Sequence, residues 1–344
     1  MNRVWKNSPR MNTAWTSSMW GRMGVALSAQ WAGPVFRAVG LVCAAGLLTA
    51  ATPHPDNLPD RPLQGAEGVT SLSGQVMDVT GQGLAGVELS VGASHTVTDN
   101  AGRFLLPYVI PGKTVLQIDG RRAGAKRDVD YGFHEVSVEA APGQTTVLPF
   151  RNWLTRINHT HDVVIESPTR SEVVVRTPAF PDFELRIPAG VVIRDVDGKV
   201  VRRVGITAVP SNRLPAPLPE KLEVPMVPLI HPGAACLYDA KGGVGTATMV
   251  FPNFLRELPK ARAVLWRYEP DGNGWAPYGM GSVSADGRQV VPDPGVVITD
   301  FGSAECEPGK ATRQPPIERP EHRRRGVQSD PAPSVVPGSA VRKP

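Results

Sequence analysis

Residues 72–118 read LSGQVMDVTGQGLAGVELSVGASHTVTDNAGRFLLPYVIPGKTVLQI and carry the most structural information in the chain. Short runs in which apolar and polar residues alternate are separated by clusters of Gly, Asp, Asn and Pro. This arrangement is typical of antiparallel strands that are joined by tight turns. We therefore predict an all-β unit here, which extends over residues 70–150.

The order of residues in this unit closely resembles the carboxypeptidase regulatory-like domain, a small transthyretin-type β-sandwich. The resemblance rests above all on Thr98-Asp99-Asn100-Ala101-Gly102-Arg103-Phe104. In that family the element is a hairpin, which implies a positive φ at Gly102 and a core-facing strand that begins with Phe104. The family's domain is a non-catalytic module, so the resemblance implies a scaffold and brings no hydrolytic residue.

The composition of the whole chain favours strands and turns over helices. The chain has 344 residues, with 35 Gly, 35 Pro and only 6% aromatic residues. This length allows two or three domains. We expect an all-β fold of two or three tandem β-sandwich domains with little helix beyond an N-terminal signal helix.

Residues 1–51 have the layout of a secretory signal. They contain five basic residues and no acid, and they include the apolar run 38–51, which closes with the small residues Ala50 and Ala51. A basic region, an apolar region and a small-residue cleavage site define a signal peptide. A membrane-spanning helix needs about 20 apolar residues, so an uncleaved anchor would have to extend further back. We predict a secreted or cell-surface protein that meets the membrane only through this leader.

The charge of the remaining chain does not indicate a surface that binds nucleic acid. The whole chain has a net charge of +5, but without the leader 32 basic residues face 32 acidic ones. Binding to nucleic acid requires a concentrated basic surface. We therefore expect no nucleic-acid partner.

The chain after the leader divides into four further segments. Residues 52–69 are predicted to be a linker, residues 70–150 the first sandwich, residues 151–304 a second β-rich region, and residues 305–344 a disordered tail rich in Pro and Arg. Strands are predicted in the second region at 162–165, 172–175, 183–187, 200–209 and 263–268. Turns are predicted where Gly198 and Gly287 follow aspartates.

The second region looks like the part that precedes the repeats in bacterial Rhs (YD-repeat) surface proteins. The matching motifs are LRIPAG (185–190), DGK (197–199), PAPLP (215–219), HPGA (231–234), FPN (251–253), LWRY (265–268) and GWAPYGMGSVSADG (274–287). The resemblance implies a partner that is another surface or Rhs-type polypeptide, or an envelope component. The family's YD-repeat arrays do not follow in this sequence, so the chain is similar to the front end alone.

Two cysteines, Cys236 and Cys306, follow the leader, and an exported protein meets an oxidising compartment. An even number of cysteines favours pairing there. A disulfide requires Cα atoms within about 7 Å of each other, and the sequence leaves this distance open.

Two sets of residues are candidates for binding chemistry. If residues 159–162 form a strand, His159 and His161 point to one face as two metal ligands, although no third ligand follows at a recognisable spacing. An exposed polar strand entry is the alternative interpretation. The second set consists of the aromatic residues Trp266, Tyr268, Trp275 and Tyr278. They either form a platform for sugar rings or pack in a core, and the alternation within 265–268 fits both interpretations. Core packing is preferred, because large aromatic side chains in small sandwiches are usually buried.

We find no catalytic constellation in the sequence and predict no cofactor and no enzymatic activity. The preferred interpretation is an exported, non-catalytic β-sandwich protein that acts as a binding or assembly module at the cell surface. A carbohydrate-binding module is the first alternative, and a metal-dependent enzyme is the second.

Overall fold

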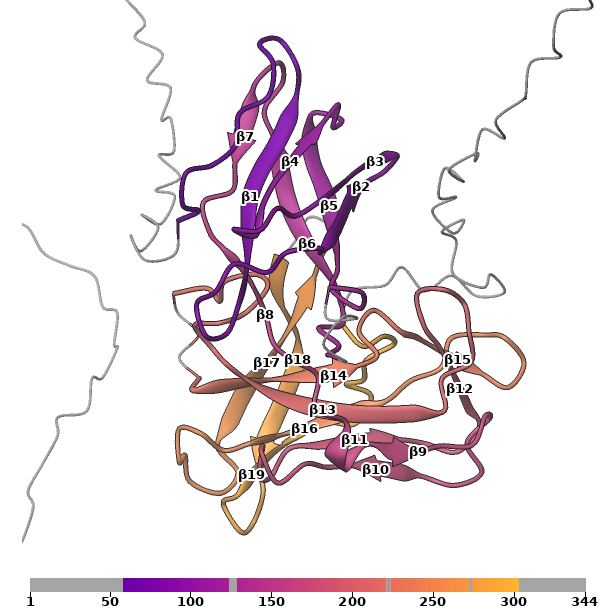
Figure 1. The fold of residues 1–344 in the computed structure, drawn as a ribbon. Helices are drawn as coiled ribbons and strands as arrows, with labels where there is room; N and C mark the ends of the chain where they lie inside the picture. Colours follow the sequence, from indigo (N-terminus) through magenta and orange to yellow (C-terminus); the bar gives the residue numbers. More distant parts are fainter. Residues whose placement is uncertain (1–57, 124–128, 221, 223, 272–273, 303–344) are drawn as a thin grey trace, which may run out of the picture. The chain divides into compact units, whose positions relative to one another are not determined.

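The computed structural model describes residues 58–123, 129–220, 222, 224–271 and 274–302. The leader, residues 52–57 of the linker, the tail and Cys306 lie outside the described residues. Within them the chain consists of short strands, one 3-10 helix and no α-helix, which confirms the all-β prediction (Figure 1). No described helix has the length and apolar character that crossing a membrane requires.

The strands of the first half are β1 Ser71–Asp78, β2 Glu88–Val91, β3 Ser94–Val97, β4 Arg103–Pro107, β5 Gly112–Asp119, β6 Phe133–Ala140, β7 Thr145–Val147 and β8 Asn152–Leu154. Then follow the 3-10 helix η3 His159–His161, β9 Val163–Val164, β10 Val173–Val175, β11 Glu184–Ile187, β12 Val191–Arg194 and β13 Arg203–Pro210. The last strands are β14 Met226–His231, β15 Cys236–Asp239, β16 Thr248–Pro252, β17 Arg262–Glu269, β18 Gly274–Val283 and β19 Gln289–Pro292.

The first half is a sandwich of two sheets around one core. One sheet has the order β4-β1-β7, with β8 also paired to β1, and the other has the order β3-β2-β5-β6. Strand β1 is buried at all eight positions, because it lies in the middle of its sheet. The large side chains between the sheets include Leu72, Phe104, Leu116 and Ile118, which are at most 1% exposed.

Gly102 forms the turn before β4 in the way that the sequence pattern predicts. Its φ is +74°, and a Cβ placed on it would lie only 2.0 Å from the carbonyl oxygen of Val76. Both the conformation and the close backbone contact therefore require glycine. The other two predicted turn glycines, Gly198 and Gly287, have φ values of +75° and +74°.

The second half holds three sheets. The largest has the order β10-β11-β16-β19-β18-β17, and the smaller ones are β14-β13-β9 and β12-β15. Alternate residues of β11, β12 and β13 point inward, and they share one core with β14, β15 and β16. Phe183, Leu185, Ile187, Ile193 and Leu237 are at most 1% exposed in this core.

The second half covers the outer edge of β6 in the first sandwich. The Tyr268 hydroxyl on β17 accepts a hydrogen bond from the Ser137 backbone N–H at 2.8 Å. At Gly233, a Cβ would lie 2.3 Å from the Phe133 carbonyl oxygen, so the two backbones approach closely. An edge strand with unpaired backbone groups is thereby protected, and the end of β17 lies beside β6 in Figure 1.

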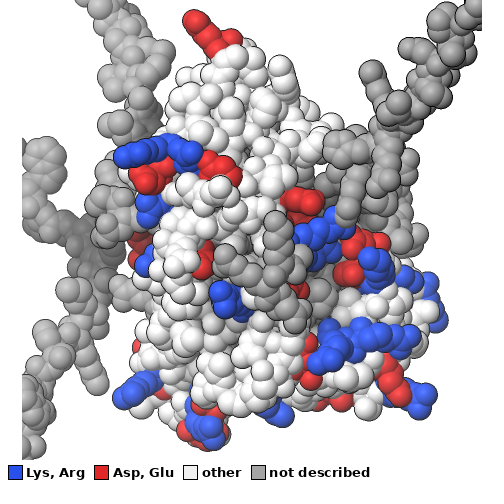
Figure 2. Space-filling view, viewed as in Figure 1, with Lys and Arg blue, Asp and Glu red and all other residues white. Residues whose placement is uncertain are grey.

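Charged side chains of both signs are interspersed on the face drawn in Figure 2. Several of them form ion pairs, for example Glu184 with both Arg176 and Arg186 at 2.6 Å. Arg121 bridges the halves, because it pairs with Asp119 at 2.7 Å and with Asp197 at 3.1 Å.

Candidate functional site

The strand conformation at residues 159–162 that a His159–His161 metal pair would require is not formed, because His159–His161 is the 3-10 helix η3. The Asn158 side chain starts this helix by accepting a hydrogen bond from the Thr160 backbone N–H at 3.0 Å. A 3-10 helix has three residues per turn, so His159 shares a face with Asp162 instead of His161. The predicted pairing of His159 with His161 is therefore wrong, and His161 is exposed.

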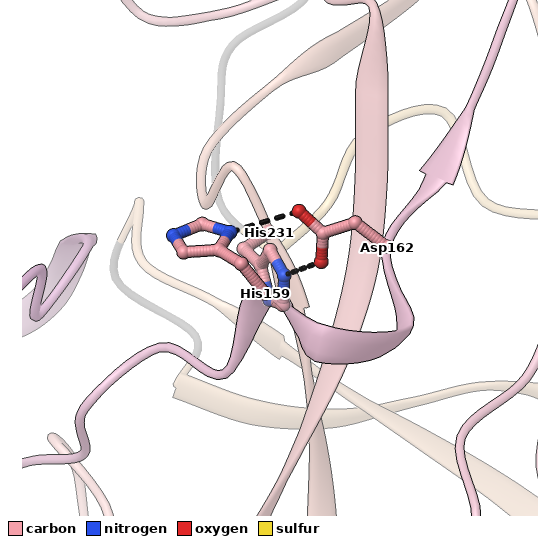
Figure 3. A group of neighbouring side chains, drawn as sticks. All are labelled: His159, Asp162 and His231. Atoms are coloured by element: carbon pink, nitrogen blue, oxygen red, sulfur yellow. Dashed lines mark hydrogen bonds and ion pairs between the residues drawn. The ribbon is translucent and has the colours of Figure 1, made fainter.

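Asp162 instead joins His159 to a distant histidine, His231 (Figure 3). One carboxylate oxygen, Oδ2, lies 2.8 Å from Nδ1 of His159, and the other, Oδ1, lies 2.8 Å from Nε2 of His231. The two imidazole rings meet edge to face with centroids 5.2 Å apart. We call these three residues the His-Asp-His cluster.

The register of the β14-β13-β9 sheet brings the cluster together. Strand β9 begins directly after Asp162 and pairs with the start of β13, where Val204 lies opposite Val163. On the other edge of β13, Gly205 lies opposite His231 at the end of β14. A strand of eight residues therefore connects two segments that are 69 positions apart in the sequence.

The cluster is buried on one side and open on the other. The side chains of Asp162 and His231 are 2% and 4% exposed, whereas His159 is 53% exposed. Burial lowers the pKa of His231 even though the Asp162 carboxylate opposes the shift. Two outer charges approach the cluster: Asp130 lies 3.9 Å from His159, and the Arg203 guanidinium lies 3.7 Å from Asp162.

A cavity of about 660 Å³ adjoins the cluster. Its walls include basic, acidic and apolar side chains from both halves of the described chain, such as Arg121, Asp130, Asp195 and Ile157. Two imidazole nitrogens and a carboxylate beside a cavity are the donor set that divalent transition metals prefer. The same three groups also hold η3 against β14 through hydrogen bonds alone.

The four aromatic candidates differ in their surroundings. Tyr268 and Tyr278 pack against the cores, and burial raises the pKa of Tyr268 to about 12 and that of Tyr278 further still. Trp266 and Trp275 line two neighbouring cavities, of about 180 and 350 Å³, and Tyr268 also lines the smaller one. The indole Nε1 of Trp275 is buried and has no hydrogen-bond partner among the described residues.

The smaller of these two cavities contains an unusual carboxyl group. Glu135 of β6 lines it together with Arg267 and Asp300. Burial raises the pKa of Glu135 to about 7, the Asp300 carboxylate adds to this shift, and a hydrogen bond from Gln117 at 3.1 Å opposes it.

The larger cavity is an apolar groove along β17. Its walls are formed by residues 262–266 of β17, by segments 224–228 and 251–255, and by parts of β18 and β19. Leu255 and Val264 of this groove are 70% and 48% exposed, and Leu258 nearby is 77% exposed. We call this feature the β17 groove.

Cys236 is fully buried at the start of β15 and is disulfide-bonded. The expected partner, Cys306, lies outside the described residues, so the pairing of these two cysteines stays a prediction.

The sequence did not predict that Asp162 and His231 belong to one cluster with His159, or that Gly205 contacts this cluster. Only the Asn158 cap could have indicated a turn at 159–161, because Asn before a short polar segment is typical of a helix start. His231 gives no local signal, since its position depends on the pairing of β13 with β14.

Comparisons with known proteins add little to this picture. No protein-family model matches the sequence, and no curated protein matches it. Among solved structures, the TIE protein of Bacillus anthracis is similar with 14% identity and a TM-score of 0.21 over 69% of this chain. The chain spans about half of that protein, 49% of its length. A proposed carbohydrate-binding protein of Bacteroides uniformis has 12% identity and a TM-score of 0.14, with 67% of this chain and 98% of that chain covered. Likenesses of this size carry no argument about function.

Proposed function

We propose that this protein is an exported, non-catalytic β-sandwich module that binds an extended polypeptide segment at the cell surface, along the edge of β17. The observation that carries the proposal is the position of β17 at the end of the six-stranded sheet. With eight residues it is far longer than β10 at the opposite end, which has three. Within the described residues β17 pairs only with β18.

An edge strand favours a polypeptide over other ligands. Its outward N–H and C=O groups pair with another backbone, which gives affinity without requiring a particular sequence. Successive side chains of an added strand point to opposite faces, so every second one would reach the β17 groove.

The chemistry of the groove defines the segment that would fit. Its β17 wall is the apolar run Ala263-Val264-Leu265-Trp266, and Leu255 across the groove is exposed. Exposed apolar patches of this kind mark interaction sites. We infer a partner segment with apolar residues at alternate positions. The resemblance to Rhs-type proteins favours another surface polypeptide of that system as its source.

Site-specific photo-crosslinking in the native cell tests the proposal. A photoreactive residue at Val264 is expected to crosslink to one polypeptide, which mass spectrometry identifies. The matched control is Val97, which is 55% exposed on β3 at the edge of a different sheet. Equal crosslinking at both positions would contradict binding along β17.

Competition with purified full-length protein sharpens this experiment. Charged residues on an edge strand prevent pairing. Unlabelled wild-type protein and the control variant Val97→Lys are expected to suppress the Val264 crosslink, whereas Val264→Lys is expected to leave it intact. Suppression by Val264→Lys equal to that by the wild type would refute the proposal.

Carbohydrate binding is the second candidate, and one observation favours it. Trp266 and Trp275 lie between two cavities, and the smaller cavity adds Glu135, Asp300 and Arg267 as polar groups. Aromatic walls with a few polar groups suit a sugar ring. Binding on a glycan array that disappears in Trp275→Ala, with the circular dichroism spectrum unchanged, would favour this candidate over the first.

A further inference from the structure

We propose that His159, Asp162 and His231 bind a divalent transition-metal ion, with zinc preferred, and leave one coordination position open toward the adjoining cavity. The inference is independent of the proposed polypeptide binding. It rests on the geometry of three donor atoms, on the backbone that supports them and on the charges around them.

The donor atoms are close enough for one ion to replace their present hydrogen bonds. One ring nitrogen of His159, one of His231 and a carboxylate oxygen of Asp162 all lie within 4.8 Å of one another. Two imidazoles and one carboxylate form a known ligand set for zinc, with metal–donor distances of about 2.0–2.2 Å. The His159 ring is 53% exposed and η3 carries no buried residue, so packing does not prevent the ring from rotating toward an ion.

Gly205 is the second observation, and it indicates that the fold reserves space for this cluster. A Cβ at this position would lie 2.0 Å from Oδ1 of Asp162 and 2.2 Å from Nε2 of His231. The two donor atoms therefore converge directly on the bare backbone of β13. Gly205 lies opposite His231 itself, in the pair that ends the β13–β14 ladder at the last residue of β14.

Two charged groups surround the cluster. Metal-bound histidines commonly orient their second nitrogen toward a carboxylate. Nε2 of His159 faces the Asp130 carboxylate at 3.9 Å, which is longer than a hydrogen bond, while its Nδ1 faces the cluster. The Arg203 guanidinium opposes a cation, but it is 61% exposed and its 3.7 Å contact with Asp162 is too long for a hydrogen bond, so it is free to turn to solvent.

The open position follows from the number of protein ligands. Zinc in proteins is usually four-coordinate, so three ligands leave a site for water or for a donor from a bound molecule. The cavity of about 660 Å³ lies on this side of the cluster. An ion here would also connect η3 to β14, so we expect it to raise the thermal stability of the protein.

Metal content and cobalt spectroscopy of the full-length protein test the proposal. Protein stripped with EDTA, incubated with excess zinc and desalted is expected to retain about one equivalent by elemental analysis. Cobalt(II) in place of zinc is expected to give visible d–d absorption that zinc removes. Retention of no stoichiometric metal, or cobalt without this absorption, would overturn the proposal.

His159→Ala and His161→Ala form a matched pair of variants on the same short helix. The first removes a proposed ligand and is expected to lose the bound equivalent, and the second is expected to keep it. His159 is exposed, so its loss leaves the cores intact. Loss of metal from both variants or from neither would overturn the assignment. Asp162→Asn, with its fold checked by circular dichroism, is expected to lose the metal too.

Discussion

Gly205 sets the space for the His-Asp-His cluster, since a single methyl group at this position would collide with two of its three side chains. The residue is not in a turn, and it lies within β13 opposite His231. Its role is therefore steric: it lets a carboxylate and an imidazole approach the strand backbone. In the sequence, no local pattern distinguishes Gly205 from the rest of the 35 glycines.

Gly205→Ala is expected to lower the free energy of unfolding by about 2 kcal/mol, because overpacking forces the buried side chains to move. Zinc retention is expected to fall in the same variant. Urea denaturation and elemental analysis measure the two effects. A variant with wild-type stability would show that the cluster tolerates displacement, contrary to the close contacts described above.

Glu135 makes stability depend on pH. Its pKa rises from 4.5 to about 7 on folding, chiefly through burial. The folded protein therefore holds the proton more tightly than the unfolded chain, so this group's contribution to stability is present below pH 4.5 and is lost as the pH rises toward 7.

Glu135→Gln removes this dependence while it keeps a side chain of the same shape. The quantity to compare is the unfolding free energy of the wild type minus that of Glu135→Gln. We expect this difference to fall by about 2 kcal/mol from pH 4.5 to pH 7. Urea denaturation of both proteins across this range provides the comparison. A difference that does not change with pH would place the Glu135 carboxyl in contact with solvent.

At the scale of the elements, the sequence predicts strands well where one face is buried. The alternation in 183–187 and 263–268 corresponds to β11 and β17 within one residue at each end. At 159–162 every side chain is polar, so alternation carries no information about a buried face. There the Asn158 cap decides the local structure, and the same residues form η3.

Asn158→Ala tests this cap. The variant loses the hydrogen bond from the Thr160 N–H, which is expected to cost about 1 kcal/mol. Because η3 positions His159, zinc affinity is expected to weaken as well, and isothermal titration calorimetry measures it. His161→Ala, which leaves the cap in place, serves as the control. Unchanged stability and affinity in Asn158→Ala would mean that packing alone holds η3.

At the scale of the whole described chain, both candidate sites depend on pairing between strands that are far apart in the sequence, and the sequence alone does not show this pairing. The cluster needs the pairing of β13 with both β9 and β14, and the β17 groove needs β17 to end its sheet. The local alternation of apolar and polar residues indicates neither the pairing partners of β13 nor the edge position of β17. The glycine turns and the strands were predictable, whereas the contact between β17 and the first sandwich was not.

Tyr268→Phe tests that contact. The variant keeps the ring and removes the hydroxyl that accepts from the Ser137 N–H, so a partly buried donor on β6 loses its partner. We expect a loss of about 1–2 kcal/mol in unfolding free energy. Differential scanning calorimetry measures the loss, and Tyr108→Phe, whose ring is 78% exposed, is the control. Equal stability of the Tyr268 variant and the wild type would show that Ser137 finds another acceptor.

Polypeptide binding along β17 is the central claim, and hydrogen–deuterium exchange tests it most directly. The purified full-length protein is measured alone and with the polypeptide that crosslinks at Val264. We predict slower exchange of the β17 backbone amides in the mixture, with β3 unchanged as the edge of another sheet. Slowing that is absent from β17, or that appears in β3 instead, would contradict the account.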